Sequence, residues 1–335
     1  MRILIVSDAW FPQVNGVVRT LSAVADLLRA DGDTVEVIGP DRFHSLPMPG
    51  YAEIRLAVAP SARLRRLVDA FAPEAVHIAT EGPLGWAMRS LCRKHRWPFT
   101  TAFHTRFPEY LEARTRIPAR WSWRIMRRFH EAGAGTFAAT ATLRDELAAR
   151  GFTKVRPWTR GVDTSRFRPG DRGAWDGLPR PIFLYAGRVA VEKNIEAFLA
   201  LDLPGTKVVV GDGPALAELK RRFPDAIYTG YRENGALVSA YAGADVFVFP
   251  SRTDTFGLVL LEALASGTPV AAFPVMGPKD VVTDPRIGAL DEDLRTACLL
   301  ALDGDRDACR RHAEAWSWQA CAAQFRATLV QVGAG

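Results

Sequence analysis

The amino-acid sequence predicts an α/β protein made of two doubly wound parallel-sheet domains. Short runs of β-branched and aromatic residues alternate with amphipathic helical stretches along the chain, and this alternation is typical of parallel strands joined by crossover helices. The pattern runs through two successive series, with glycine-rich turns at the strand ends, which favours two open sheets over one closed barrel. A chain of 335 residues is long enough for two such domains.

Each series contains five predicted strands. In the first series, helices such as Val17–Arg29 and Pro83–His95 separate the strands Arg2–Val6, Thr34–Ile38, Ala75–Ile78, Phe99–Ala102 and Gly135–Ala138. In the second series, the strands are Ile182–Ala186, Lys207–Val210, Ala226–Thr229, Val246–Phe249 and Val270–Phe273. The stretch between Arg156 and Arg180 is rich in proline, glycine and arginine, so it is the predicted boundary. Ligands of such sheets bind outside the carboxyl ends of the strands, so we expect the site in the cleft between the domains.

The composition is that of a soluble globular protein, with 48% hydrophobic and 24% charged residues. No run approaches the roughly 20 apolar residues that a membrane-spanning helix needs, and the apolar opening Arg2–Val6 is too short for a signal peptide. We therefore expect a cytoplasmic protein. The four cysteines show no paired spacing, so neither a disulfide framework nor a zinc site is predicted.

The net charge of +6 is concentrated in two arginine clusters of the first half. One holds Arg63, Arg65 and Arg66. The other interleaves arginines with tryptophans, and its members include Arg114, Arg116, Arg120, Trp121, Trp123, Arg124, Arg127 and Arg128. A basic helix with tryptophans on another face suits an anionic membrane surface. A solvated arginine face over a packed helix is the alternative. Nucleic acid is a third candidate, but no helix-turn-helix, RRM or zinc-finger signature is present.

Residues 254–262 carry the most chemical information in the chain. A strand that ends at Pro250 is followed by a polar loop, and a helix is expected to begin near Gly257. The unpaired N–H groups of such a helix start suit a phosphate. Asp254 and Glu262 are about two helical turns apart, so on one face both could reach hydroxyls of the same ligand. Alternatively, Asp254 caps the helix and Glu262 is an ordinary solvated residue.

Other strand ends carry further candidate residues. Asn15-Gly16 begins a helix after the first strand, where a missing side chain lets a phosphate or a sugar approach the backbone. Arg188 and Lys193 follow the strand Ile182–Ala186 and could both reach a diphosphate. His104 follows the strand Phe99–Ala102, whereas His130 ends the arginine/tryptophan helix, where a capping role suffices. The turn Val210-Gly211-Asp-Gly213-Pro would let the backbone approach a base or a ribose.

Taken together and in order, these segments resemble the family 4 retaining glycosyltransferases of the GT-B fold. The resemblance covers nearly the whole chain: Pro12…Asn15-Gly16, Phe103-His-Thr…Phe107-Pro-Glu-Tyr110, Arg160-Gly-Val-Asp163 with Phe167-Arg-Pro169, Gly187-Arg…Glu192-Lys-Asn194, Gly211-Asp-Gly-Pro214, Tyr241-Ala-Gly-Ala-Asp245 with Val246-Phe-Val-Phe-Pro-Ser251, and Asp254…Glu262. It implies two Rossmann-like domains facing a cleft. An acceptor-binding domain would span residues 1–165 and a nucleotide-sugar-binding domain residues 166–315, with a C-terminal helix in 316–335 that packs back on the first domain.

The resemblance also implies transfer of a sugar from a nucleotide-diphosphate donor with retention of configuration, and with neither cofactor nor metal. Arg188 and Lys193 match the family pair that binds the donor diphosphate, Asp254 matches the acid that contacts the donor sugar, and Glu262 matches the acid that holds the ribose. His104 matches the family histidine near the donor sugar. Further donor contacts are implied for Gly16, Gly211, Gly213, Phe256, Gly257 and Leu258. Asp254 stands where the family more often has Glu, and Asn15-Gly16 where many members have Gly-Gly, so the transferred sugar is left open.

Asp254, the Phe107-Pro-Glu-Tyr110 segment and the arginine/tryptophan helix look most like the branch that glycosylates membrane lipids. That branch includes diacylglycerol glucosyl-, glucuronosyl- and sulfoquinovosyl-transferases and GDP-mannose-dependent mannosyltransferases. We therefore expect a lipid acceptor, an anionic membrane surface contacted through Arg120, Trp121, Arg124, Arg127 and Arg128, no nucleic acid, and a place at the cytoplasmic face of the membrane. The alternatives are a soluble or polysaccharide acceptor, and a non-catalytic nucleotide- or nucleic-acid-binding protein. A phosphorylase would need a pyridoxal phosphate lysine, which the sequence does not reveal.

Overall fold

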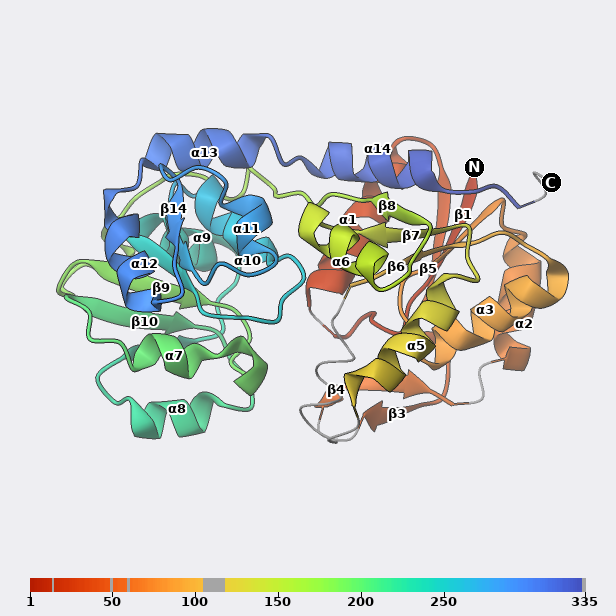
Figure 1. Cartoon of the computed structure of the whole chain (residues 1–335), viewed down its shortest axis with the longest axis horizontal. Coiled ribbons are helices and arrows are strands. Elements are labelled where there is room, and N and C mark those ends of the chain that lie inside the picture. The colour runs from red at the N-terminus through yellow and green to blue at the C-terminus, as the bar shows by residue number, and fades with distance from the viewer. Residues whose placement is uncertain (14, 49–50, 59–60, 105–117, 333–335) are drawn as a thin grey trace. The chain divides into compact units, whose positions relative to one another are not determined.

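The computed structural model describes residues 1–13, 15–48, 51–58, 61–104 and 118–332, and it divides into two compact units. Unit 1 is Met1–Arg160 together with the C-terminal segment from Trp318, and unit 2 is Gly161–Ser317. The domain bounds implied by the sequence resemblance are 165/166 and 315/316. The C-terminal segment carries helix α14 (Trp318–Thr328), which packs against α1 of unit 1 (Figure 1).

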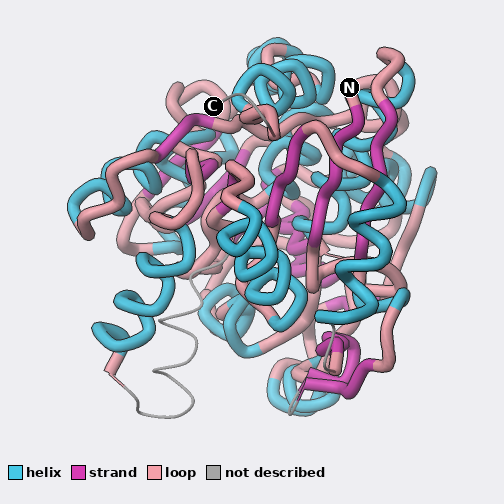
Figure 2. The backbone as a smooth tube through the Cα atoms, turned by 90° about the vertical axis from the view of Figure 1, so that its right-hand side faces the viewer, coloured by secondary structure: helices cyan, strands magenta, loops and turns pink. Residues whose placement is uncertain are grey.

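Unit 1 is built around a parallel sheet of six strands in the order β2-β1-β5-β6-β7-β8. Figure 2 shows these strands side by side, with helices around them. Its described elements are β1 Arg2–Val6, α1 Gly16–Ala30, β2 Thr34–Ile38, η1 Pro40–Arg42, β3 Ser45–Met48, β4 Tyr51–Ala57, α2 Ser61–Phe71, β5 Ala75–Ile78, α3 Pro83–His95, β6 Thr100–Ala102, α5 Ala119–His130, β7 Gly135–Ala138, α6 Ala141–Ala149, β8 Val155–Pro157 and α14.

Unit 2 has a second six-stranded parallel sheet, in the order β11-β10-β9-β12-β13-β14. Its elements are η2 Gly173–Trp175, β9 Ile182–Ala186, η3 Val191–Lys193, α7 Ile195–Leu199, β10 Thr206–Val210, α8 Leu216–Arg222, β11 Ile227–Gly230, α9 Asn234–Gly243, β12 Val246–Phe249, α10 Leu258–Ala265, β13 Val270–Ala272, α11 Pro278–Val281, β14 Gly288–Leu290, α12 Leu294–Leu300, η4 Ala301–Asp303 and α13 Arg306–Glu314. The doubly wound fold class predicted from the sequence is therefore confirmed in both units.

The buried apolar runs explain why the central strands were predictable. Every residue of β5, β9 and β12 is buried, as expected for strands covered by helices on both faces. The predicted strands Phe99–Ala102, Lys207–Val210 and Val270–Phe273 each differ from the structure by one residue at one end, and Ala226–Thr229 is shifted by one residue at both ends. The edge strands β8 and β14 and the antiparallel hairpin β3–β4 were not predicted, because three-residue edges and a partly exposed hairpin carry no long apolar run.

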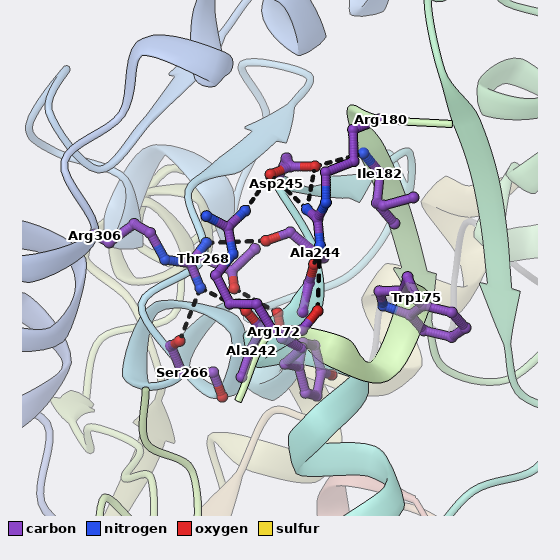
Figure 3. Close-up of polar contacts among 12 residues, drawn as sticks. Arg172, Trp175, Arg180, Ile182, Ala242, Ala244, Asp245, Ser266, Thr268 and Arg306 are labelled. Carbon is purple, nitrogen blue, oxygen red and sulfur yellow. Dashed lines mark hydrogen bonds and ion pairs between the residues drawn. The ribbon is translucent and has the colours of Figure 1, made fainter. Parts of the chain in front are cut away.

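An arginine cluster joins the start of the unit 2 sheet to the segment that leads into it (Figure 3). Asp245, just before β12, accepts hydrogen bonds from the guanidinium groups of Arg172 and Arg180 and, at 2.7 Å, from the backbone N of Ile182. Arg306 donates to the carbonyls at the ends of α9 and α10, namely those of Ala242, Ala244 and Ser266, where a cation opposes the helix dipole. These contacts fix the amino-terminal edge of the sheet, opposite the edge that carries the candidate residues.

Candidate functional site

The candidate donor site lies at the carboxyl ends of β9 and β12, two neighbouring strands of unit 2. The chain runs outward from β9 through β10 to β11 on one side, and from β12 through β13 to β14 on the other. The strand order therefore reverses between β9 and β12, and open parallel sheets bind their ligands at such a switch point. Arg188 follows β9 and Asp254 follows β12.

Lys193 and Asp254 form an ion pair in this region. Lys193 Nζ lies 2.6 Å from Asp254 Oδ1, and the two side chains are only 25% and 19% exposed. Asp254 Oδ2 is buried and accepts no hydrogen bond from any described residue. A buried carboxylate oxygen without a donor is unfavourable, so Asp254 is anchored by one oxygen and can accept a ligand hydroxyl with the other.

Hydrogen bonds between the two loops hold this pair in place. The side-chain amide of Asn194 donates to Pro250 O at 3.0 Å, and Thr253 Oγ1 donates to Glu192 O at 3.3 Å. Asn194 adopts the left-handed conformation, with φ +53°, which an asparagine tolerates better than most residues. This conformation ends η3 and begins α7. Lys193 is therefore fixed at the end of one strand against the loop that follows its neighbour.

Gly211 and Gly213 pack against the loop that carries Arg188. A Cβ atom on Gly211 would lie 1.8 Å from Gly187 O, and one on Gly213 would lie 2.3 Å from Val189 O. The backbone N of Val189 also donates to Asp212 O at 2.8 Å. Both glycines are thus required by a close approach within the protein itself. Their contact with a base or a ribose stays a prediction. Arg188 is half-buried, and its carbonyl accepts a hydrogen bond from Tyr185 OH at 2.7 Å.

Helix α10 begins at Leu258, and this corrects the expected arrangement of the two acids. Gly257 has φ +87° and is the N-cap residue, with no side-chain cap. Asp254 therefore lies on the preceding loop and not on a helix face with Glu262, and the alternative that it caps the helix is wrong. Phe256 is buried beside this helix start. Within the first turn of α10, the backbone N of Leu260 donates to Gly257 O at 3.0 Å, and the N–H groups of Leu258 and Val259 precede the first hydrogen bond of the helix.

Glu262 is buried on α10, so the alternative that it is an ordinary solvated residue is wrong as well. Glu262 is only 6% exposed, and its Oε2 accepts a hydrogen bond from the hydroxyl of Tyr241 at 3.0 Å. In the sequence, Tyr241 stands out only as part of the motif Tyr241-Ala-Gly-Ala-Asp245. Its hydrogen bond to Glu262 could not be predicted from sequence spacing, because Tyr241 lies on α9 and Glu262 on α10.

His104 lies just after β6 in unit 1, as predicted. Its ring packs edge-on against Trp158, and its Nδ1 is 3.4 Å from Arg160 Nη2. Burial, and then the positive charge of Arg160, hold the pKa of His104 well below its ordinary value. Burial likewise lowers the pKa of Arg160 to about 10. The imidazole is therefore neutral at physiological pH and acts there as a hydrogen-bonding group, not as a cation.

Gly16 is exposed at the start of α1. The side chain of Asn15 accepts hydrogen bonds from the backbone N of Val17 at 2.9 Å and of Val18 at 3.0 Å. These bonds cap the helix, and the residue after the cap has no side chain to block a ligand that approaches the helix start.

Helix α5 separates an aromatic face from a basic one. Trp123, Met126 and Phe129 are buried in unit 1, whereas Trp121 is 52% and Ile125 56% exposed. A groove of about 460 Å³ runs along the exposed face and is lined by Trp121, Arg124, Ile125, Arg127, Arg128 and Glu131. Arg120 also lies on this face, while Arg114 and Arg116 fall outside the described residues. The same holds for the Phe107-Pro-Glu-Tyr110 segment.

His130, at the end of α5, is buried and is not the helix cap. One ring nitrogen lies 2.8 Å from Thr101 Oγ1 on β6, and the other 3.0 Å from Glu81 Oε1 after β5. The helix is therefore fastened to the carboxyl edge of the unit 1 sheet. Among the described residues, no helix is long and apolar enough to span a bilayer, and no group of three or more His, Cys, Asp or Glu side chains could hold a metal ion.

Comparison with solved structures supports the GT-B fold. Sucrose-phosphate synthase from Thermosynechococcus elongatus superposes with a TM-score of 0.76 at 20% identity, over 97% of each chain. Anabaena Alr3699/HepE, solved in complex with UDP and glucose, superposes with a TM-score of 0.72 at 15% identity, over 97% of this chain and 98% of that one. At these identities the similarity establishes the fold alone.

Curated sequences give closer relatives. A GDP-mannose-dependent alpha-mannosyltransferase of Mycobacterium tuberculosis is 34% identical over 87% of this chain and 83% of its own length. Sulfoquinovosyl transferase SQD2 of Arabidopsis thaliana is 30% identical over 96% and 72%. Alpha-monoglucosyldiacylglycerol synthase of Streptococcus pneumoniae is 26% identical over 90% and 78%. Residues 14–166 match the sequence model of Glycosyltransferase Family 4, and residues 180–303 match that of Glycosyl transferases group 1. The chain is therefore a glycosyltransferase that uses a nucleotide-sugar donor, and it belongs to glycosyltransferase family 4.

Proposed function

We propose that this glycosyltransferase moves a hexosyl unit from a nucleotide-diphosphate sugar to a membrane lipid, with retention of configuration and without a catalytic metal. The observation that carries the donor assignment is the Lys193–Asp254 pair at the switch point of unit 2. It presents a cation for a diphosphate beside a carboxylate oxygen that has no donor among the described residues. A sugar diphosphate needs both kinds of group at adjacent positions.

Arg188 and Lys193 stabilise the leaving group in this proposal. When the bond between the sugar and the diphosphate breaks, negative charge grows on the departing phosphate oxygens. Two fixed cations in a partly buried site stabilise that charge more strongly than water does, because they need little reorganisation. The arginine supplies a bidentate fork and the lysine a point charge, which is the task that a metal ion performs in other transferases.

Asp254, Glu262 and His104 bind the two ends of the donor. Asp254 Oδ2 accepts hydroxyls of the sugar, and Glu262 binds the ribose hydroxyls. His104, neutral because of its burial, stabilises the positively charged transition state of the sugar or orients a hydroxyl. Gly16, Phe256, Gly257 and Leu258 contribute backbone contacts to the sugar and the phosphates.

GDP-mannose is the first donor to test, because a relative at 34% identity is a GDP-mannose-dependent alpha-mannosyltransferase. UDP-glucose and UDP-glucuronate are the other donors proposed. The lipid acceptor is supported by the diacylglycerol-glycosylating relative and by the exposed Arg/Trp face of α5. Basic side chains and an exposed tryptophan suit a helix that lies on an anionic surface, so we propose peripheral association with the cytoplasmic face of the membrane.

A donor panel combined with a lipid extract, read by mass spectrometry, tests this function. The wild type and Glu262→Ala are compared for release of free nucleotide and for sugar transfer. Glu218→Ala is the matched control, because Glu218 is an exposed helical glutamate of the same unit. We expect Glu262→Ala alone to lose donor turnover. Equal nucleotide release by the three proteins would overturn the role of Glu262, and a product found only on soluble sugars would overturn the lipid acceptor.

A further inference from the structure

Tyr241 is a buried tyrosine whose hydroxyl group faces the acid proposed to bind ribose. Its side chain lies on α9 and has no exposed surface, and its OH donates to Glu262 Oε2 at 3.0 Å. A carboxylate out of reach of bulk water needs hydrogen-bond donors from the protein. Tyr241 supplies such a donor from within the core, at the side of Glu262 that solvent does not reach.

The tyrosine ring is itself held in one orientation. It packs against Phe167 and Phe247, with ring centroids 5.9 Å and 5.5 Å away. Thr268 Oγ1 donates to Tyr241 O at 2.7 Å, and Ser266 Oγ donates to Glu262 O at 2.9 Å. Both partners of the hydroxyl–carboxylate bond are thus fixed at the backbone, so the bond can determine the rotation of the carboxylate.

We infer that Tyr241 is a positioning residue that orients the Glu262 carboxylate toward the two hydroxyls of the donor ribose. This inference rests on the proposed function of Glu262. The terminal torsion of a glutamate is broad, so a hydrogen bond to one carboxylate oxygen favours the orientations that can accept two neighbouring hydroxyls at once. A carboxylate has about four acceptor positions, so the bond on Oε2 still leaves capacity for a ribose.

The role predicts a specific kinetic pattern. Tyr241→Phe removes the hydroxyl and keeps the ring that packs on Phe167 and Phe247. We expect the donor KM, and the inhibition constant of the free nucleoside diphosphate, to rise about five- to tenfold, the size of one typical hydrogen bond. We expect kcat to change less than about twofold, because the ribose contact is made equally in the ground state and the transition state.

Dideoxy nucleotides separate positioning from a purely structural role. GDP and UDP are titrated in the ribose form and in the 2′,3′-dideoxyribose form, below the melting temperature of the least stable variant. The wild type is expected to prefer the ribose form, and Tyr241→Phe and Glu262→Gln each to shrink that preference. The double variant should lose little more than either single one, because both act on the same contact. Tyr228→Phe is the control, since in the described part of the chain the hydroxyl of Tyr228 bonds to Leu219 O and Phe223 O, away from Glu262.

The outcomes distinguish the two proposals. If Glu262→Gln loses the ribose preference but Tyr241→Phe keeps the wild-type ratio, the positioning role of Tyr241 is overturned and the ribose role of Glu262 stands. If Glu262→Gln itself keeps the wild-type ratio, the ribose role fails and the inference fails with it. A lower melting temperature of Tyr241→Phe with an unchanged ratio would show that the tyrosine only supports the fold.

Discussion

The two units share one architecture but use the polar residues at their sheet edges differently. In unit 1, the carboxylate of Asp8 follows β1 and accepts hydrogen bonds from the backbone N of Leu84 at 2.9 Å and of Gly85 at 3.2 Å, with a third from Thr80 Oγ1 at 3.0 Å. In unit 2, Asp254 follows β12 and its Oδ2 accepts none from the described residues. Both acids follow a strand inside a sheet. Both carboxylate oxygens of Asp8 accept hydrogen bonds from unit 1, whereas only Oδ1 of Asp254 has a partner in the described part of unit 2.

This difference in hydrogen bonding indicates which unit has an acceptor left for a ligand. Two acids of unit 1 anchor helices: Asp8 holds the start of α3, and Glu81 holds the end of α5 through His130. Burial raises the pKa of Asp8, which fits a structural carboxyl group. Unit 2 keeps acceptor capacity at Asp254, and this supports the proposal that unit 2 binds the donor. Unit 1 carries His104 after β6 and the exposed face of α5.

The largest expected effect comes from removing the cations of unit 2, which tests whether this unit binds the donor. We expect Arg188→Ala and Lys193→Met each to lower kcat by about 10²- to 10³-fold, as measured for other groups that stabilise charge in a transition state. Steady-state kinetics with the best donor of the panel measures the loss. Arg221→Ala, an exposed arginine of α8 paired with Glu218, is the control. Near-wild-type turnover in both variants would mean that unit 2 does not neutralise the leaving group.

Removing the basic face of α5 tests the corresponding role of unit 1. An arginine near an anionic surface contributes about 1 kcal/mol, so Ala at Arg124, Arg127 and Arg128 should weaken binding to anionic vesicles about 100-fold at low salt. Liposome co-sedimentation measures it. The control removes Lys220, Arg221 and Arg222 from α8, which takes the same charge from unit 2. If only the control weakens binding, or if neither does, the membrane assignment of α5 is wrong.

Mild acid should destabilise unit 1 more than unit 2. Burial lowers the pKa of His77 to about 3, while an unfolded histidine titrates near 6.5. Between these values the unfolded chain binds more protons, so the stability contributed by neutral His77 is present above pH 6.5 and is lost as the pH falls. The loss approaches about 1.4 kcal/mol per pH unit. His104 shifts in the same direction.

Urea unfolding at pH 7 and pH 5, followed by tryptophan fluorescence, measures this loss. His77→Gln should flatten the pH dependence, whereas His95→Gln, at an exposed position, should leave it unchanged. A His77→Gln protein that weakens with acid as steeply as the wild type would show that another group carries the effect.

The smallest expected effect concerns the reach of Asp254. Asp254→Glu adds one methylene between the backbone and the carboxylate, and we expect it to change the ratio of kcat/KM between two donor sugars by about tenfold or less. The same donor panel measures the ratio, with the exposed Asp225→Glu as control. An unchanged ratio would mean that residue 254 does not select the sugar.

Much of the site could be placed from the sequence, because strand ends are easy to locate. The runs Ile182–Ala186 and Val246–Phe249 are short, apolar and bounded by turn residues, so Arg188 and Asp254 were correctly assigned to strand ends. The helix start near Gly257 was predicted correctly, but the prediction that Asp254 and Glu262 share a helix face is wrong, because Asp254 lies before the N-cap Gly257, whose φ is positive. The sequence pattern did not reveal that Gly257 adopts this conformation.

The sequence by itself determined the doubly wound fold of both units and the order of the residues that mark the family, because hydrophobic periodicity and turn residues act locally along the chain. Tertiary structure alone decided which acid is anchored, buried or available. The Lys193–Asp254 pair, the Tyr241–Glu262 bond and the burial that keeps His104 neutral each join residues from different elements. Such contacts depend on packing in three dimensions, which no spacing along the chain encodes.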